Sequence, residues 1–118
     1  MLLVEDEAAL LDLGKTILED QGYKVLAAQS PLTALKLASD HAGPLDLLVT
    51  DVIMPEMNGR ELNQAVIAAR PGVKTLFMSG YPAELIAHHG VIDEGVNFLQ
   101  KPFTAKVLAS KVREVLDS

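Results

Sequence analysis

Short runs of apolar residues alternate along the chain with longer stretches in which apolar residues recur at helical spacing. The short runs leave no position for a solvated face and predict buried strands at residues 2–4, 25–28, 47–49, 73–78 and 96–99. The stretches that follow them predict amphipathic helices, as in Leu10, Leu13 and Ile17, which recur at i, i+3 and i+7. Strand and helix thus alternate five times.

The predicted helices carry signals at their ends. Ser30 followed by Pro31 is a strong start for the second helix, and Thr104 caps the last one. Glycines and prolines end other helices, at Gly22 and at residues 42–44 and 71–72. The fourth helix, over residues 82–89, is short and weakly indicated. The alternation predicts an α/β fold, a doubly wound five-stranded parallel sheet forming a single domain over residues 1–118.

Composition excludes several classes of function. The chain has 118 residues, 49% of them hydrophobic, which is enough to build one core without disulfides or metals as staples. Its net charge of −6 and the lack of any Lys/Arg cluster argue against direct contact with nucleic acid. No run of about 18 apolar residues and no signal sequence is present, so we expect no membrane contact by this domain. Cysteine is absent, and the cytoplasm is the expected location.

Polar residues stand at the carboxyl ends of four predicted strands, the edge at which open parallel sheets bind their ligands. They are Glu5, Asp6 and Glu7 after the first strand, Asp51 after the third, Ser79 after the fourth and Lys101 after the fifth. Taken singly, each has an ordinary explanation as a helix cap, a turn residue or a solvated lysine. Their convergence on one edge is less easily explained that way.

Carboxylates within a few ångströms of one another cannot all stay ionised without a cation. Carboxylate and carbonyl oxygens suit Mg²⁺, which commonly bridges to a phosphoryl group. A lysine and a hydroxyl beside the metal would hold the remaining phosphate oxygens. The combination indicates phosphoryl transfer to a carboxylate, with an aspartate as the covalent nucleophile.

Other motifs are missing. The sequence contains no G-x-G-x-x-G, no P-loop and no G-x-S-x-G elbow, which argues against nucleotide binding and serine hydrolase chemistry. His88 and His89 are adjacent and are expected to be surface residues of a helix rather than metal ligands. Met54, Met57 and Met78 are expected to pack in loops and in the core.

Four sequence blocks resemble the receiver domains of two-component response regulators. The blocks are L-L-V-E-D-E, L-L-V-T-D-V-I-M-P-E-M-N-G, F-M-S-G-Y and F-L-Q-K-P-F, each at the expected element and in the expected order. The resemblance covers the whole chain and implies a flavodoxin-like (βα)5 fold with strand order 2-1-3-4-5. It further implies a signalling switch that accepts a phosphoryl group from a phosphohistidine in a Mg²⁺-dependent reaction.

The resemblance also assigns roles to individual residues. Asp51 corresponds to the phosphoacceptor, and Mg²⁺, or Mn²⁺ in its place, is bound by Asp51, Asp6, Glu5 and the backbone carbonyl of Ile53. Ser79 and Lys101 contact the phosphoryl group, Ser79 and Phe98 form the switch, and the Lys101–Pro102 bond is expected to be cis. Bulky side chains at Ile53 and Tyr81 are expected to limit the access of water, which predicts slow loss of the phosphoryl group.

Two positions depart from the family pattern. Glu5 stands where many members have aspartate, so its contact with the metal is expected to be longer or through water. Phe98 stands where others have tyrosine, so a partner contact that needs this hydroxyl is lost. The strings around Ser79 and Lys101 look most like receivers of hybrid sensor histidine kinases, some of which are membrane-bound with this part in the cytoplasm.

The expected partners are a histidine kinase or a phosphotransfer histidine domain, with weak dimerisation on phosphorylation. The chain ends with its last helix, so no effector domain is expected here. It is expected to be either a stand-alone regulator or an excised piece, and Met1 at the start of a strand favours the excised piece. Two alternatives remain open. An aspartate-nucleophile phosphatase of the haloacid dehalogenase type needs a second aspartate at the position of Ile53, and a pseudo-receiver usually lacks one of the acidic residues or the lysine.

Overall fold

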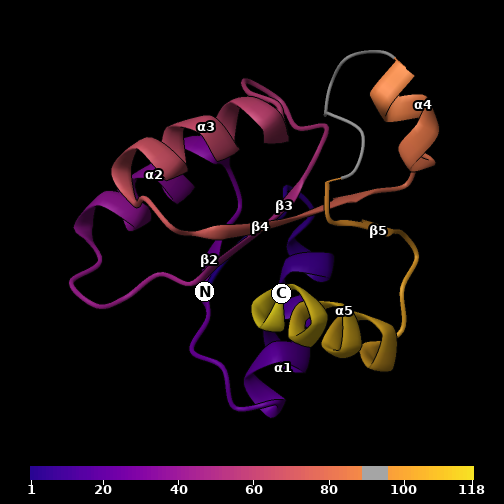
Figure 1. The fold of residues 1–118 in the computed structure, drawn as a ribbon, viewed down its shortest axis with the longest axis horizontal. Helices are drawn as coiled ribbons and strands as arrows, with labels where there is room; N and C mark the ends of the chain where they lie inside the picture. Colours follow the sequence, from indigo (N-terminus) through magenta and orange to yellow (C-terminus); the bar gives the residue numbers. More distant parts are fainter. Residues whose placement is uncertain (89–95) are drawn as a thin grey trace.

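A five-stranded parallel sheet forms the centre of the molecule. The computed structural model describes residues 1–88 and 96–118. The strands are β1 (Leu2–Val4), β2 (Leu26–Ala28), β3 (Leu47–Asp51), β4 (Lys74–Ser79) and β5 (Phe98–Gln100). They pair in parallel in the order β2-β1-β3-β4-β5 (Figure 1), which confirms the predicted strand order.

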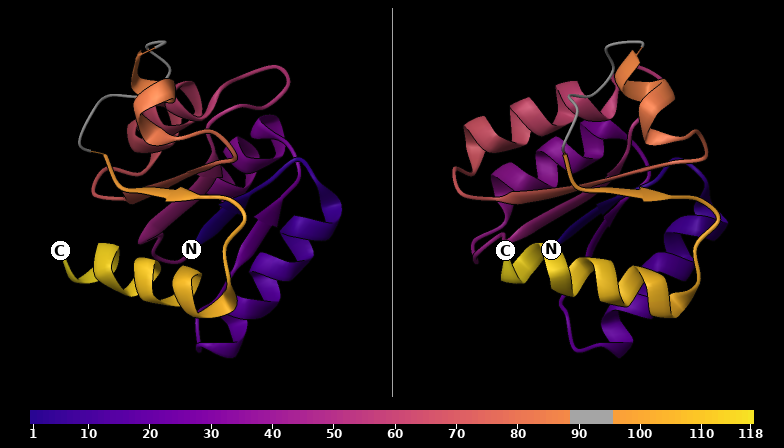
Figure 2. Two further views of the ribbon diagram at one scale, coloured as in Figure 1. Left: turned by 90° about the vertical axis from the view of Figure 1, so that its right-hand side faces the viewer. Right: turned by 45° about the vertical axis from the view of Figure 1, so that its right-hand side comes forward.

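Helices cover both faces of this sheet. They are α1 (Ala8–Asp20), α2 (Pro31–Asp40), α3 (Gly59–Ala69), α4 (Ala83–His88) and α5 (Ala105–Asp117). Helices α1 and α5 lie on one face, whereas α2 and α3 lie on the other (Figures 1 and 2). Each face has its own apolar cluster, because successive side chains of a strand point to opposite sides: Leu47 and Val49 pack toward α1 and α5, and Leu48 toward α2 and α3.

A third, smaller apolar cluster lies beside α4. It joins Val52, Phe77 and Ile86, and Val96 and Phe98 pack against it. The strand predicted over residues 96–99 is shifted in the structure, where β5 begins only at Phe98. Val96 is apolar because it packs against this cluster and not because it pairs in the sheet. Helix α4 confirms the predicted weak helix as far as residue 88, and His89 lies outside the described residues.

The predicted caps are confirmed, and one more is found. Ser30 Oγ accepts the backbone N–H of residue 33 at 3.2 Å, and Thr104 Oγ1 accepts that of residue 107 at 3.2 Å. Helix α3 begins with a capping box that the sequence reading did not include. Asn58 Oδ1 accepts the N–H of Glu61 at 2.9 Å, while Glu61 Oε1 accepts the N–H of Asn58 at 3.1 Å. This box fixes the start of the helix that follows Asp51.

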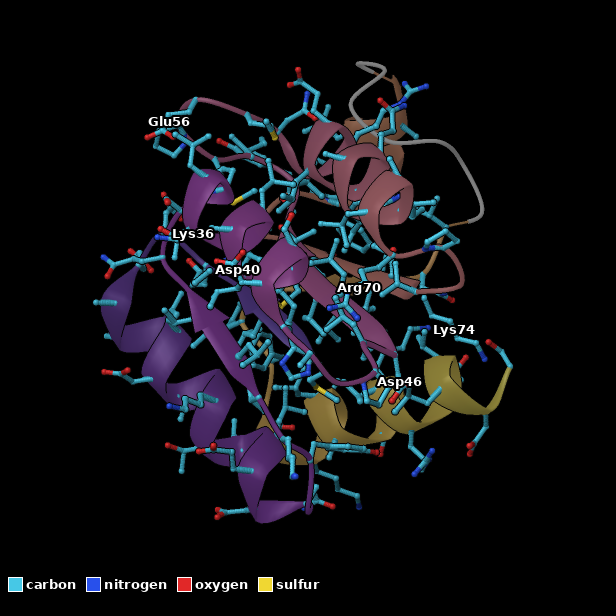
Figure 3. All side chains as sticks on the ribbon, turned by 90° about the vertical axis from the view of Figure 1, so that its left-hand side faces the viewer. Lys36, Asp40, Asp46, Glu56, Arg70 and Lys74 are labelled. Atoms are coloured by element: carbon cyan, nitrogen blue, oxygen red, sulfur yellow. The ribbon has the colours of Figure 1, made fainter. Side chains whose placement is uncertain are left out.

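Cationic side chains tie the loops together at the amino ends of the strands, opposite the end where the polar residues gather. Figure 3 shows Arg70, Asp46 and Lys74 in this region, away from Glu56 at the other end. The Arg70 guanidinium donates to three carbonyl oxygens, those of residues 38, 41 and 43, and so holds the end of α2 and the loop after it. Among the described residues, none of the helices is both long and apolar enough to cross a bilayer.

The methionines pack as expected. Met54 and Met78 are buried, and Met57 packs partly buried against the cluster between the sheet and helices α2 and α3.

Candidate functional site

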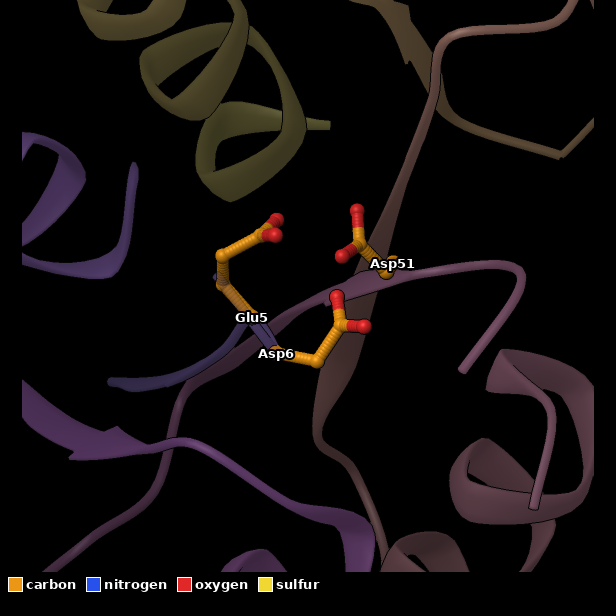
Figure 4. Close-up of side chains that lie close together, drawn as sticks. All are labelled: Glu5, Asp6 and Asp51. Carbon is orange, nitrogen blue, oxygen red and sulfur yellow. The ribbon is translucent and has the colours of Figure 1, made fainter. Parts of the chain in front are cut away.

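Three carboxylates meet at the carboxyl ends of two neighbouring strands, β1 and β3. Glu5 and Asp6 directly follow β1, and Asp51 is the last residue of β3, which pairs with β1. One oxygen from each side chain lies within 4.8 Å of the others, and the three side chains face a common space (Figure 4). The parallel topology thus brings together residues 45 positions apart, as the sequence predicted.

Lys101, the residue directly after β5, joins this cluster. Its Nζ lies 2.5 Å from Asp51 Oδ1 and 2.6 Å from Glu5 Oε2, so one ammonium bridges two carboxylates. The backbone N–H of Lys101 donates to the carbonyl oxygen of Ser79 at 2.8 Å, which anchors the lysine beside the end of β4. The following peptide bond, Lys101–Pro102, is cis, as predicted.

Two of the three carboxylates are buried whereas Asp6 is exposed, and the site carries more negative than positive charge. Asp51 is 4% exposed and Glu5 2% exposed. Burial, followed by the neighbouring Glu5, raises the pKa of Asp51 to about 8, although Lys101 opposes the shift. Burial would also raise the pKa of Glu5, but hydrogen bonding to Asp51 and Lys101 holds it below its ordinary value. Burial acts to lower the pKa of Lys101, yet the two carboxylates raise it above the ordinary value.

Asp51 Oδ1 is paired with the Lys101 ammonium, 2.5 Å away. Apart from this ion pair, the described residues donate no hydrogen bond to this buried atom. A buried carboxylate is costly unless a cation neutralises it, and here one ammonium serves both Asp51 and Glu5. Glu5, Asp6 and Asp51 each offer one carboxylate oxygen to the common space, a donor set that fits a hard divalent cation such as Mg²⁺.

The acidic residues after β1 are more than helix caps. Glu7 is the N-cap residue of α1, but its side chain makes no capping hydrogen bond. Glu5 Oε1 accepts the N–H of Glu7 at 3.1 Å while Oε2 faces Lys101, so Glu5 links the start of α1 to the site. Sequence reasoning paired Lys101 with a phosphoryl group and missed its ion pair with Glu5, although one lysine among several acids at one sheet edge could have indicated it.

The other predicted site residues differ in their burial and in their contacts. Ser79 ends β4, is buried, and its Oγ accepts the N–H of Tyr81 at 3.0 Å. Phe98 pairs with Phe77 and packs, partly buried, against the cluster beside α4. The side chains of Ile53 and Tyr81 are about half exposed, at 53% and 54%.

The model of the response regulator receiver domain family matches residues 1–113. The chain is a response regulator receiver domain. Over 117 residues it is 39% identical to the sensor kinase CckA of Brucella abortus, an alignment covering 99% of this chain and 12% of that protein. It is 25% identical over 116 residues to the response regulator SaeR of Staphylococcus aureus, covering 98% of this chain and 50% of that protein.

Solved receiver domains have the same fold. The crystal structure of the receiver domain of the hybrid histidine kinase CckA matches with a TM-score of 0.81 at 36% identity, over 98% of this chain and 96% of that one. A receiver domain protein of Methanospirillum hungatei matches with a TM-score of 0.80 at 30% identity, over 98% and 91% of the two chains. The receiver domain has the flavodoxin-like fold predicted for it, and it spans half or less of the curated relatives described above.

Proposed function

We propose that this receiver domain is a phosphorylation-dependent switch in which Asp51 accepts a phosphoryl group from a phosphohistidine. The observation that carries the proposal is the convergence of Glu5, Asp6 and Asp51 within 4.8 Å, with Lys101 Nζ 2.5 Å from Asp51. Membership of the receiver family supports it.

Asp51 acts as the nucleophile. One of its carboxylate oxygens bonds to phosphorus as the nitrogen–phosphorus bond of the phosphohistidine breaks, and the electron pair of that bond stays on the imidazole. Asp51 must be ionised to attack, whereas its surroundings raise its pKa to about 8. Because this value already includes the opposing effect of Lys101, a further cation would be needed to keep Asp51 ionised at neutral pH.

Mg²⁺ would be held by Asp6, Asp51, the backbone carbonyl of Ile53 and, more remotely, Glu5. When bound, it would neutralise charge on the carboxylates and on the phosphoryl oxygens. Lys101 binds and orients a phosphoryl oxygen as a point charge, and in doing so exchanges its contact with Asp51 for one with phosphate. Glu5 keeps its ion pair with the ammonium at 2.6 Å and so holds Lys101 in place.

The switch consists of Ser79 and Phe98. The Ser79 hydroxyl is free to donate to a phosphoryl oxygen, because in this structure its oxygen acts as an acceptor from Tyr81. Movement of Ser79 toward the phosphate would free space beside β4, into which Phe98 could turn from its place against Phe77 and Ile86. The surface that includes α4 would then change for a partner.

The parent protein is proposed to be a hybrid sensor histidine kinase with this domain in the cytoplasm. The identity to the sensor kinase CckA of Brucella abortus and the structural match to the CckA receiver domain support this context. The partners would be a histidine kinase or a phosphotransfer histidine domain, and phosphorylation would favour a weak dimer.

Mass spectrometry after incubation with a small acyl phosphate tests the proposal. We expect the wild-type domain to gain one phosphoryl group in the presence of Mg²⁺ and none in EDTA, and Asp51→Asn to gain none. Asp46→Asn is the matched control, since this exposed aspartate lies at the amino end of β3, and it should react as the wild type does. Phosphorylation of Asp51→Asn, or of the wild type in EDTA, would refute the assignment.

A further inference from the structure

One hydroxyl lies in an otherwise apolar part of the sheet, directly before the phosphoacceptor. Thr50 is fully buried, and its neighbours across the sheet are Val4 on β1 and Phe77 on β4. By strand alternation its side chain shares the face of Leu48, which packs toward α2 and α3. A valine has nearly the same shape and would avoid burying a hydroxyl there, so packing alone does not explain the threonine.

The hydroxyl has a specific partner. Thr50 Oγ1 donates to the carbonyl oxygen of Asp51 at 3.0 Å and also contacts Met54 Sδ at 3.9 Å. A hydroxyl has one hydrogen, and a carbonyl oxygen is a much better acceptor than a thioether. The Thr50 side chain therefore holds the Asp51 carbonyl and contacts Met54 in the loop that follows β3.

Other contacts converge on the same short segment. The N–H of Val52 donates to the carbonyl oxygen of Met78 at 2.9 Å, and the N–H of Gly59 donates to that of Val52 at 2.7 Å. Gly59 also lies so close to the Asp51 carbonyl that a Cβ there would be only 2.3 Å from its oxygen. The orientation of the Asp51–Val52 peptide is thus fixed from the strand, from α3 and, through Thr50, from the core.

We propose that Thr50 is a positioning residue of the phosphoacceptor site. By holding the Asp51 carbonyl, its hydroxyl sets the direction in which the chain leaves β3. That direction determines the position of the Ile53 carbonyl, which would face the metal in the proposed function, and the inference rests on that function. Groups that hydrogen-bond to metal ligands and orient them contribute to metal affinity without contacting the metal.

Calorimetric titration with Mg²⁺ alone tests this role, with no phosphodonor present. We expect Thr50→Val to bind Mg²⁺ about tenfold more weakly, at the low end of what the loss of an outer-shell partner costs. Thr50→Ser, which restores the hydroxyl, should bind within about twofold of the wild type. The matched control is Thr75→Val on β4. The Thr75 hydroxyl donates to Asn63 Oδ1, at a distance of 2.5 Å, in a part of the sheet away from the site, so this change should leave the affinity for Mg²⁺ unchanged.

A metal-free readout separates this inference from the proposed function. In EDTA, the backbone amide resonances of residues 52–54 and Gly59 should move in Thr50→Val and return toward the wild-type positions in Thr50→Ser. Wild-type affinity in Thr50→Val together with unmoved amides would overturn the inference, as would a Thr50→Ser variant as weak as Thr50→Val. Failure of the wild type to bind Mg²⁺ would refute the proposed metal site instead, and the amide shifts would still decide the role of Thr50.

Discussion

Replacing Gly59 by alanine tests how tightly α3 is fitted against the end of β3. A Cβ at this position would lie 2.3 Å from the Asp51 carbonyl oxygen and 3.0 Å from Val52 Cα, both of them backbone atoms. Carbon atoms in proteins pack at about 3.5 Å, so α3 and the end of β3 must separate by about 1 Å. Neither can yield easily, because the capping box holds Asn58 and the sheet holds Val52.

The expected cost has two parts. Overpacking in a close-packed interior costs about 1–3 kcal/mol. The hydrogen bond from the N–H of Gly59 to the Val52 carbonyl, 2.7 Å long, is stretched or lost, which adds about 1 kcal/mol. We expect Gly59→Ala to lower the free energy of unfolding by about 2–4 kcal/mol in total. Because the displaced peptide belongs to Asp51, the variant that remains folded should also bind Mg²⁺ more weakly.

Urea unfolding followed by circular dichroism measures this loss. Gly80→Ala is the matched control: it makes the same change in the unfolded chain, but a Cβ at Gly80 meets nothing within 4 Å. The control should stay within about 0.5 kcal/mol of the wild type, as surface substitutions usually do. Equal unfolding midpoints for Gly59→Ala and Gly80→Ala would show that the close approach at Gly59 relaxes freely, and the reasoning would be wrong.

Three further predictions follow from the site. In EDTA the folded state holds a proton on Asp51 up to about pH 8, whereas the unfolded chain releases it near the ordinary value of 3.8. The stability that this proton contributes is therefore fully present below about pH 4 and is lost as the pH rises to about 8. Over that range the free energy of unfolding of Asp51→Asn, measured with urea, should rise by a few kcal/mol relative to that of the wild type. A difference between the two proteins that does not depend on pH would contradict this. Adding beryllofluoride and Mg²⁺ should shift the amide resonances of Phe98 and of residues 80–90, of which residues 89 and 90 lie outside the described part of the chain. Shifts confined to the neighbours of Asp51 would refute the switch. The phosphorylated protein should lose its phosphoryl group slowly, and Ile53→Asn combined with Tyr81→Glu should speed the loss by about tenfold, equivalent to about 1.4 kcal/mol, whereas equal decay rates would show that these half-exposed side chains do not control water.

The strand ends could be predicted from the sequence because they depend only on pattern and topology. A continuous apolar run that stops at Val4 or Val49 indicates where a buried strand reaches the sheet edge, and a parallel sheet puts all such edges on one side. The prediction failed in detail at β5, where Val96 extends the apolar run without pairing in the sheet. An apolar residue in the sequence indicates burial, but it does not distinguish a residue that is buried within a strand from one that is buried next to a strand.

Side-chain partners were harder to predict, because they depend on reach and angle and not on position along a strand. Glu5 extends far enough to contact Lys101 with one oxygen and the N–H of Glu7 with the other. The Asn58–Glu61 capping box and the close approach of Gly59 to Asp51 likewise require the path of the loop between β3 and α3. The sequence located the site at this edge of the sheet, and the structure adds how its members hold one another.

The arrangement of charges itself argues that the site serves a ligand and not the fold. Two buried carboxylates share one ammonium, which lies 2.5 Å from Asp51 Oδ1 and 2.6 Å from Glu5 Oε2. Groups buried in this way destabilise a protein, and an apolar set of similar volume would stabilise it at least as well. The apolar clusters on the two faces of the sheet supply the stability that tolerates this conflict. Departures from the ordinary rules of packing and charge are expected where function requires them, and in the proposed function a divalent cation would offset the excess negative charge around Asp51.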